Sequence, residues 1–148
     1  MRVYLDVCCL NRPFDDQSQA RIRVEAEAVK AVAQRVDAGT DQWISSHAVE
    51  WEVRRTADPD RLSRLQSLLS EADETVAPSG AILARAARLQ RIGLGALDAF
   101  HISSAVAGRC DVFLTTDDRL LRKAQSLGPE CPLTLRNPAA WIMEVTTE

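Results

Sequence analysis

The stretch RVYLDVCC, residues 2–9, is a short apolar run with an aspartate inside it. Its valine, tyrosine and leucine residues predict a strand over 2–7 that is buried on both faces of a parallel sheet. A buried carboxylate costs several kcal/mol of stability unless another group compensates for it. Asp6 therefore requires a compensating partner at this position.

The rest of the chain alternates between strand-like and helix-like segments. Further strands are predicted at 43–46, 75–78, 111–116 and 133–137. Helical periodicity predicts helices at 18–38, 47–55, 61–72, 79–92, 96–108 and 117–128, and a last short helix begins at Pro138. Residues 11–19 have the composition of a polar loop. This order predicts an α/β fold, a three-layer α/β/α sandwich with a mainly parallel sheet of about five strands in a single domain over 1–148.

Composition narrows the function classes. The net charge of −3 argues against a protein that coats nucleic acid through bulk electrostatics. The four cysteines show no CxxC spacing, so we expect reduced thiols in place of a zinc site or a disulfide framework. No apolar run approaches the ~20 residues that span a bilayer, and we expect no signal peptide before the first strand. We expect a cytoplasmic protein without a membrane segment.

A second aspartate, Asp117, ends the most apolar strand of the chain. If that strand lies beside the strand at 2–7, Asp6 and Asp117 share the carboxyl edge of the sheet, where function collects in such folds. Alternatively, Asp117 caps the helix that follows it. Asp118 is the better candidate for that cap, because it opens the DRLLRKA segment, where its charge offsets the helix dipole.

A third aspartate, Asp98, lies on a helix that carries almost no charge. It shares one face of that helix with Ile102 and Ala105, at i+4 and i+7. An acid on such an inward face seldom lies there without a partner. His101, at i+3, is positioned to hydrogen-bond Asp98, and a packed or supporting histidine is more frequent than a metal ligand.

The fourth acid comes from the segment SSHAVEWEVRR, which offers Glu50 and Glu52. The two are ~200° apart around a helix, so only one of them faces a common site. Glu50 has Arg54 at i+4, the spacing of a solvated surface pair. Glu52 lies nearer the side that holds Ala48 and Val49, and we favour Glu52.

Four converging carboxylates repel one another and raise their own pKa values unless a cation is present. An all-oxygen ligand set without histidine or cysteine clusters selects hard ions, Mg²⁺ or Mn²⁺. Such ions bind phosphate oxygens and activate water for attack on phosphorus. The sequence therefore predicts Asp6, Glu52, Asp98 and Asp117 as the metal ligands and catalytic residues of a phosphodiester hydrolase.

The four acids lie in segments that resemble a known family. YLDVCCLNRPFDD, ISSHAVEWE, GALDAFHISSA and FLTTDDRLL, with the closing RNPAAWI, are similar in order and spacing to the motifs of PIN-domain proteins. Many of these are toxin ribonucleases of the VapC-like type. The family often has serine or threonine just after its first aspartate, where this chain has Val7 and Cys8. Asn11, Thr115 or Thr116 can contribute a polar group there instead.

The resemblance carries the family's four acidic positions to Asp6, Glu52, Asp98 and Asp117. It implies a Mg²⁺- or Mn²⁺-dependent endoribonuclease that forms a homodimer, acts on RNA and is inhibited by a small antitoxin protein encoded beside it. Arginines that flank the acid-bearing segments are candidates for contact with the RNA backbone: Arg54, Arg55, Arg119 and Arg122.

Other function classes fit the residues less well. A phosphatase of the haloacid dehalogenase type needs an acid two residues after Asp6, where Cys8 stands. A receiver domain needs an acidic pair before the strand-end aspartate, and residues 1–3 supply none. Two alternatives within the fold stay open. One is a PIN-fold module that binds RNA or protein without cleaving it, and the other is a housekeeping PIN nuclease without an antitoxin.

Overall fold

The fold is built on a parallel β-sheet. The structure is a computed structural model, and it describes residues 1–147. The strands are β1 (Arg2–Leu5), β2 (Gln42–Ser46), β3 (Glu74–Val76), β4 (Val112–Leu114) and β5 (Leu135–Arg136). Within the described residues they form one five-stranded sheet in the order β3-β2-β1-β4-β5, with every pairing parallel. This confirms the predicted sheet.

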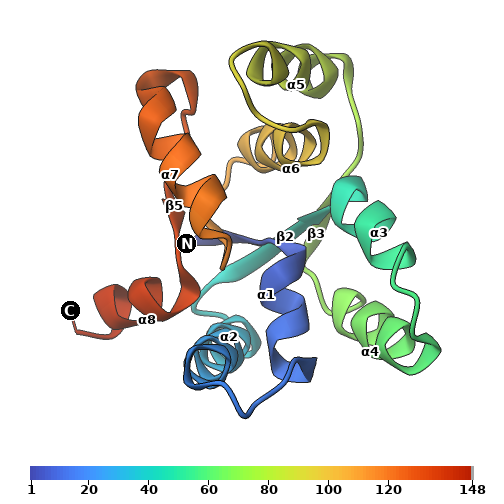
Figure 1. Cartoon of the computed structure of the whole chain (residues 1–148), viewed down its shortest axis with the longest axis vertical. Coiled ribbons are helices and arrows are strands. Elements are labelled where there is room, and N and C mark those ends of the chain that lie inside the picture. The colour runs from blue at the N-terminus through green and yellow to red at the C-terminus, as the bar shows by residue number, and fades with distance from the viewer. Residues whose placement is uncertain (148) are drawn as a thin grey trace.

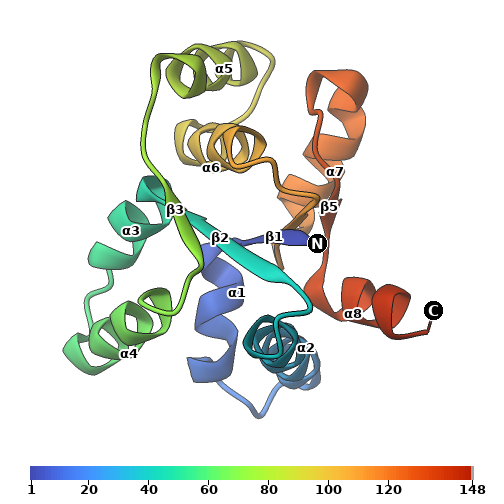
Figure 2. The ribbon, with the colours of Figure 1, turned by 180° about the vertical axis from the view of Figure 1, so that it is seen from behind.

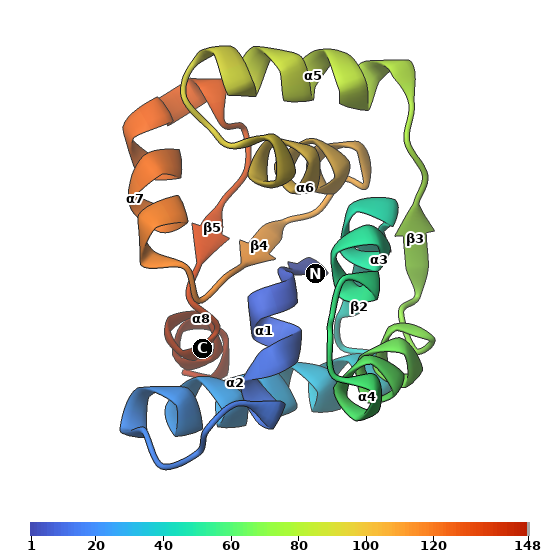
Figure 3. The same cartoon turned by 45° about the vertical axis from the view of Figure 1, so that its right-hand side comes forward.

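Helices cover both faces of the sheet. They are α1 (Val7–Asn11), α2 (Ala20–Asp37), α3 (His47–Arg54), α4 (Pro59–Leu69), α5 (Gly80–Arg91), α6 (Ala96–Ala107), α7 (Asp118–Leu127) and α8 (Pro138–Thr146), with 3-10 turns η1 (Arg12–Phe14) and η2 (Gly128–Glu130). Helices α5 and α6 lie on one side of the strands, and α2 lies on the other (Figures 1 and 2). Figure 3 shows the strands between these two groups of helices, which gives the predicted three layers. No helix within residues 1–147 is long and apolar enough to cross a membrane.

The central strand β1 and its neighbour β4 carry part of the buried core. Tyr4 and Phe113 are fully buried and their rings stack with centroids 4.9 Å apart. Leu5 pairs in register with Leu114, so β1 and β4 end at the same level. Beyond them the Asp6 N–H donates to the Leu114 carbonyl at 2.9 Å. The residues that follow β1 and β4 therefore lie together at one edge of the sheet.

The N-terminal segment differs from its prediction. The strand expected over 2–7 ends at Leu5, and Asp6 lies just beyond it as the N-cap of α1. The Asp6 carboxylate accepts the Val7 N–H at 2.8 Å, which turns the chain from strand into helix. The helix was not predicted because five residues are too few to show a helical period.

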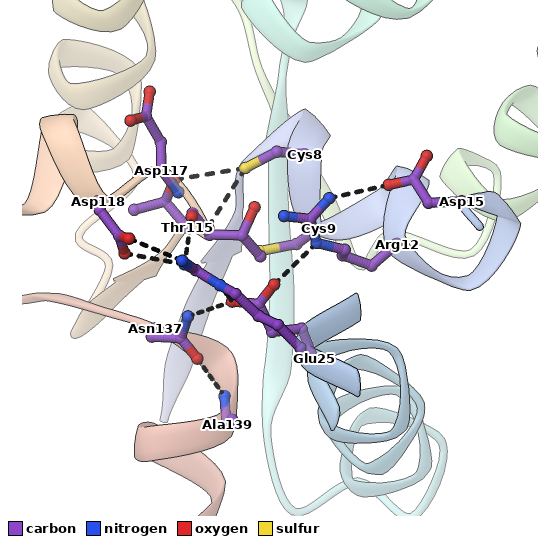
Figure 4. Close-up of polar contacts among 12 residues, drawn as sticks. Cys8, Cys9, Arg12, Asp15, Glu25, Thr115, Asp117, Asp118, Asn137 and Ala139 are labelled. Carbon is purple, nitrogen blue, oxygen red and sulfur yellow. Dashed lines mark hydrogen bonds and ion pairs between the residues drawn. The ribbon is translucent and has the colours of Figure 1, made fainter. Parts of the chain in front are cut away.

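A buried carboxylate on α2 connects three parts of the chain. Glu25 is only 2% exposed and accepts hydrogen bonds from Arg12 at 2.9 Å, Arg21 at 3.2 Å and Asn137 at 2.6 Å. Figure 4 shows Glu25 between Arg12 and Asn137. Arg21 also binds both carboxylate oxygens of Asp118, at 2.7 and 2.8 Å. This network connects α2 to η1, to the start of α7 and to the residue before α8.

We predict that Glu25→Gln lowers the free energy of unfolding by about 3 kcal/mol, because it leaves two guanidinium groups without their buried anion. This value is at the low end for broken buried pairs because Arg21 is half-exposed. Urea unfolding measures it. The control Glu27→Gln removes only an exposed pair with Lys30 and should leave stability unchanged. Equal stability of the two variants would contradict the role given to Glu25.

Candidate metal centre

Asp6 is held at the sheet edge with both oxygens engaged. Its side chain is buried, and Oδ2 accepts the Thr115 hydroxyl at 2.8 Å and lies 3.5 Å from the Cys8 sulfur. Burial raises the pKa of Asp6, and Glu52 adds to this, whereas His101 and Thr115 act in the opposite direction. The structure thus keeps a carboxylate where its ionised form is penalised. Such a group is suited to neutralisation by a cation.

Glu52 approaches Asp6 from α3. The Ser46 hydroxyl caps this helix by accepting the Val49 N–H at 3.3 Å. Glu52 Oε1 lies 2.9 Å from His101 Nε2, and the same nitrogen is 4.0 Å from Asp6 Oδ1. One ligand atom from each of Asp6, Glu52 and His101 lies within 4.8 Å of the others.

The other glutamate of the segment faces elsewhere. Glu50 lines a hollow of about 460 Å³ together with Arg54, Gln66 and Thr75. It lies on the opposite flank of α3 from Glu52, as the helical spacing requires. Of the two glutamates, Glu52 is therefore the one beside Asp6.

Asp98 and Asp117 share a second part of the site. Asp98 lies in the first turn of α6, and Asp117 caps α7 by accepting the N–H groups of Arg119 at 3.0 Å and Leu120 at 3.2 Å. Both line a hollow of about 360 Å³ whose wall also contains Arg119 and Lys123.

The expectation that Asp118 supplies the helix cap was wrong. Asp118 lies inside the first turn of α7 and pairs with Arg21, while Asp117 makes the capping bonds. The sequence did not reveal the pairing of Asp118 with Arg21, because Arg21 belongs to α2 and is distant from Asp118 in the chain. In Figure 4, Asp117 projects away from Glu25, and Cys8 lies beside Thr115.

The pKa of Asp98 is raised, and neighbouring carboxylates contribute to the shift. Burial raises the pKa of Asp98 first, and repulsion by Asp6 and then Asp117 raises it further. Glu52 adds a smaller contribution, while His101 opposes it. Within residues 1–147 no lysine or arginine forms an ion pair with any of the four carboxylates. Carboxylate oxygens that no lysine or arginine neutralises are the kind of donor that hard divalent cations prefer.

His101 does not make the predicted contact. Its ring hydrogen-bonds Glu52 and Tyr4, at 2.9 and 2.7 Å, in place of Asp98. The sequence suggested Asp98 because it is one helical turn away, but the imidazole points across to β1 and α3. Thr115, one of the polar residues suggested for this position, does contact Asp6. Tyr4 was not recognised because it has the pattern of an ordinary core residue.

The four candidate arginines lie in different surroundings. Arg119 lines the hollow of Asp98 and Asp117. Arg54 lies with Glu50, and Arg122 lines a separate hollow between α7 and β5. Arg55 covers the ring of the half-exposed Trp51, with 4.7 Å from its guanidinium carbon to the ring centroid. Of the four, only Arg119 lines the hollow that holds Asp98 and Asp117, and Lys123 lines it too.

Fold and site together define an α/β protein with an acidic centre at the carboxyl edge of a parallel sheet. The chain belongs to the PIN-domain family, because a family model described as the PIN domain matches residues 3–126. No curated protein sequence matches the chain significantly.

Two solved structures are similar to this chain in fold. One is VapBC2 from Rickettsia felis bound to a DNA fragment from their promoter, with TM-score 0.61 and 17% identity over 93% of this chain and 98% of that chain. The other is VapBC-1 from nontypeable Haemophilus influenzae, with TM-score 0.63 and 13% identity over 93% of this chain and 98% of that one. At these identities the likeness concerns the fold alone.

We predict that Asp98→Asn raises the melting temperature of the metal-free protein near pH 7. The raised pKa of Asp98 means that its ionised form destabilises the folded state above that pKa. The penalty disappears as the pH falls through the folded pKa toward about 3.9, the ordinary value, so the gain from the substitution shrinks there. Calorimetry in EDTA measures both conditions.

Asp118→Asn is the matched control with the opposite sign. The Arg21 hydrogen bonds lower the pKa of Asp118, so its charge stabilises the folded state above the ordinary pKa and is lost as the pH falls. This variant should melt lower than wild type near neutral pH. A lower melting temperature for Asp98→Asn as well would refute the repulsion inferred at the site.

Proposed function

We propose that this protein is a divalent-metal-dependent endoribonuclease that acts as the toxin of a toxin–antitoxin pair. The observation that carries the proposal is a set of four carboxylates, of which Asp6 and Glu52 lie together beside His101 while Asp98 and Asp117 line one hollow. Membership of the PIN-domain family and the fold shared with the two VapBC structures support it.

In this mechanism Asp6 and Glu52 would hold Mg²⁺ or Mn²⁺ through carboxylate oxygens, and Asp98 and Asp117 would complete the acidic site. The ion would act as a Lewis acid toward a phosphoryl oxygen and lower the pKa of a water molecule. Thr115 holds one oxygen of Asp6 and thereby sets the direction of the other. Arg119 and Lys123 bind the phosphate that enters the hollow beside the two aspartates.

We predict that EDTA abolishes ribonuclease activity and that Glu52→Gln does the same while the fold is retained. Glu50→Gln is the matched control: it changes the same residue type on the same helix, but its side chain faces another hollow, so most activity should remain. Cleavage of a labelled RNA, with circular dichroism to check folding, measures this. Activity in excess chelator would rule out the metal mechanism.

We predict that Arg119→Ala weakens RNA binding and lowers the slope of log affinity against log salt by about 0.7, the value for one lost phosphate contact on a single strand. Arg122→Ala removes the same charge from the same helix outside the acidic hollow and should leave the slope unchanged. Binding is measured by fluorescence anisotropy with EDTA present to prevent cleavage. Equal salt slopes for the two variants would contradict a contact between Arg119 and the RNA backbone.

The toxin role is tested in cells. A small partner can inhibit this site by placing an arginine or lysine among the four carboxylates, since a guanidinium pairs with them in two-pronged hydrogen bonds. We predict that expression of this chain alone arrests growth, and that Asp6→Asn or co-expression of the adjacent small reading frame relieves the arrest. If cells that express wild type grow as well as cells that express Asp6→Asn, the result would favour a housekeeping nuclease or a non-catalytic binding module.

The proposed assembly is a cytoplasmic homodimer that binds its antitoxin. Sedimentation of the purified chain, alone and with the product of the adjacent frame, measures both associations. A monomer that does not bind this product would leave the nuclease proposal intact but contradict the proposed antitoxin and homodimer.

A further inference from the structure

An imidazole, that of His101, is more deeply buried than any carboxylate of the site. His101 is 1% exposed, yet both of its ring nitrogens have partners. Nδ1 lies 2.7 Å from the Tyr4 hydroxyl, and Nε2 lies 2.9 Å from Glu52 Oε1. The Tyr4 hydroxyl in turn lies 2.6 Å from the Ser46 hydroxyl. A continuous chain of polar contacts therefore runs from the cap of α3 to the carboxylate of Glu52.

The direction of the hydrogens in this chain follows from the donors and acceptors available. An ionised carboxylate only accepts, so the imidazole satisfies Glu52 only with a hydrogen on Nε2. Neutral imidazole then leaves Nδ1 bare, and the Tyr4 hydroxyl donates to it. Burial raises the pKa of Tyr4 well above its ordinary value, so this phenol keeps its hydrogen.

The contacts of Ser46, at the other end of this row of hydrogen bonds, are consistent with that direction. The Ser46 hydroxyl donates its hydrogen to the Tyr4 oxygen and accepts the Val49 N–H with an oxygen lone pair. Every buried polar group in this relay, which consists of Ser46, Tyr4, His101 and Glu52, then has a hydrogen-bond partner. The opposite direction would place the Nε2 lone pair against a carboxylate oxygen at 2.9 Å, which is unfavourable without a cation between them.

Glu52 needs such a support. Its side chain is 30% exposed and has several rotatable bonds, whereas Asp6 is fixed by Thr115 and by the start of α1. The contact with His101 engages Oε1, whereas no hydrogen bond or ion pair within residues 1–147 engages Glu52 Oε2, so this oxygen can accept a cation. The Ser46 hydroxyl both begins the helix that carries Glu52 and anchors the relay that orients it.

We propose that His101 is a positioning residue that fixes the Glu52 carboxylate beside Asp6 by donating a hydrogen bond from Nε2, and that Tyr4 and Ser46 set the tautomer of the ring. The metal-binding role of Glu52 itself rests on the proposed function. The arrangement of hydrogens does not, and it can be measured on the metal-free protein.

Nitrogen-15 NMR of the chain reads the tautomer directly. The chain has two histidines, His47 and His101, so the variant His47→Gln assigns the spectrum. The expected pattern has a hydrogen on His101 Nε2, and Tyr4→Phe, which removes the donor to Nδ1, should shift it toward the other tautomer. A bare Nε2 in the wild type would overturn the proposal and indicate a direct metal ligand.

Two substitutions of His101 separate positioning from packing. His101→Gln retains an N–H near the place of Nε2, whereas His101→Asn is too short to reach Glu52. Mn²⁺ binding, measured by electron paramagnetic resonance of the free ion, should weaken about 10-fold in His101→Asn and stay close to wild type in His101→Gln. Equal affinities of the two folded variants would overturn the proposal.

Electron paramagnetic resonance of the bound Mn²⁺ tests whether His101 is a direct ligand. Nitrogen coupling on Mn²⁺ bound to wild type would show the imidazole as a ligand and would also overturn the positioning role. An inactive wild-type protein with the expected tautomer and the expected order of Mn²⁺ affinities would instead refute the nuclease function and leave the role of His101 standing.

Discussion

The site depends on the pairing of β1 with β4. Their register ends both strands at the same level, and the hydrogen bond from Asp6 N–H to the Leu114 carbonyl extends the pairing by one residue. That residue is where the chain leaves the sheet, so Thr115 comes within 2.8 Å of the Asp6 carboxylate. A shift of one residue between these strands would separate the two side chains and open the acidic centre.

The sequence predicts well those features that depend on local periodicity. The alternation of strands and helices gives the parallel sheet, and the helical spacing of Glu50 and Glu52 separates the glutamate beside Asp6 from the one that faces away. The sequence likewise predicts the inward face of α6, and the structure confirms it, since Ile102 and Ala105 are fully buried. The catalytic roles of the acids stay predictions.

Features that depend on tertiary partners were not predictable in this way. Asp118 loses the cap to Asp117 because Arg21, nearly a hundred positions away, draws it outward. Glu25 has the pattern of an ordinary helix-surface acid, and only the arrival of Arg12 and Asn137 from other elements makes it a buried anion. The partners of His101 come from β1 and α3, which no spacing within its own helix can indicate.

Three of the four acids stand at the start of a helix. Asp6 caps α1, Asp117 caps α7, and Asp98 lies in the first turn of α6. Unpaired backbone N–H groups and the positive end of the peptide dipoles favour negative charge at such positions. The backbone itself thus offsets part of the repulsion among the carboxylates. The consequence is preorganisation: the polypeptide can assemble its acidic centre during folding without a cation. The proposed ion would then bind to an already folded protein, unlike the metal of small domains that need it to fold.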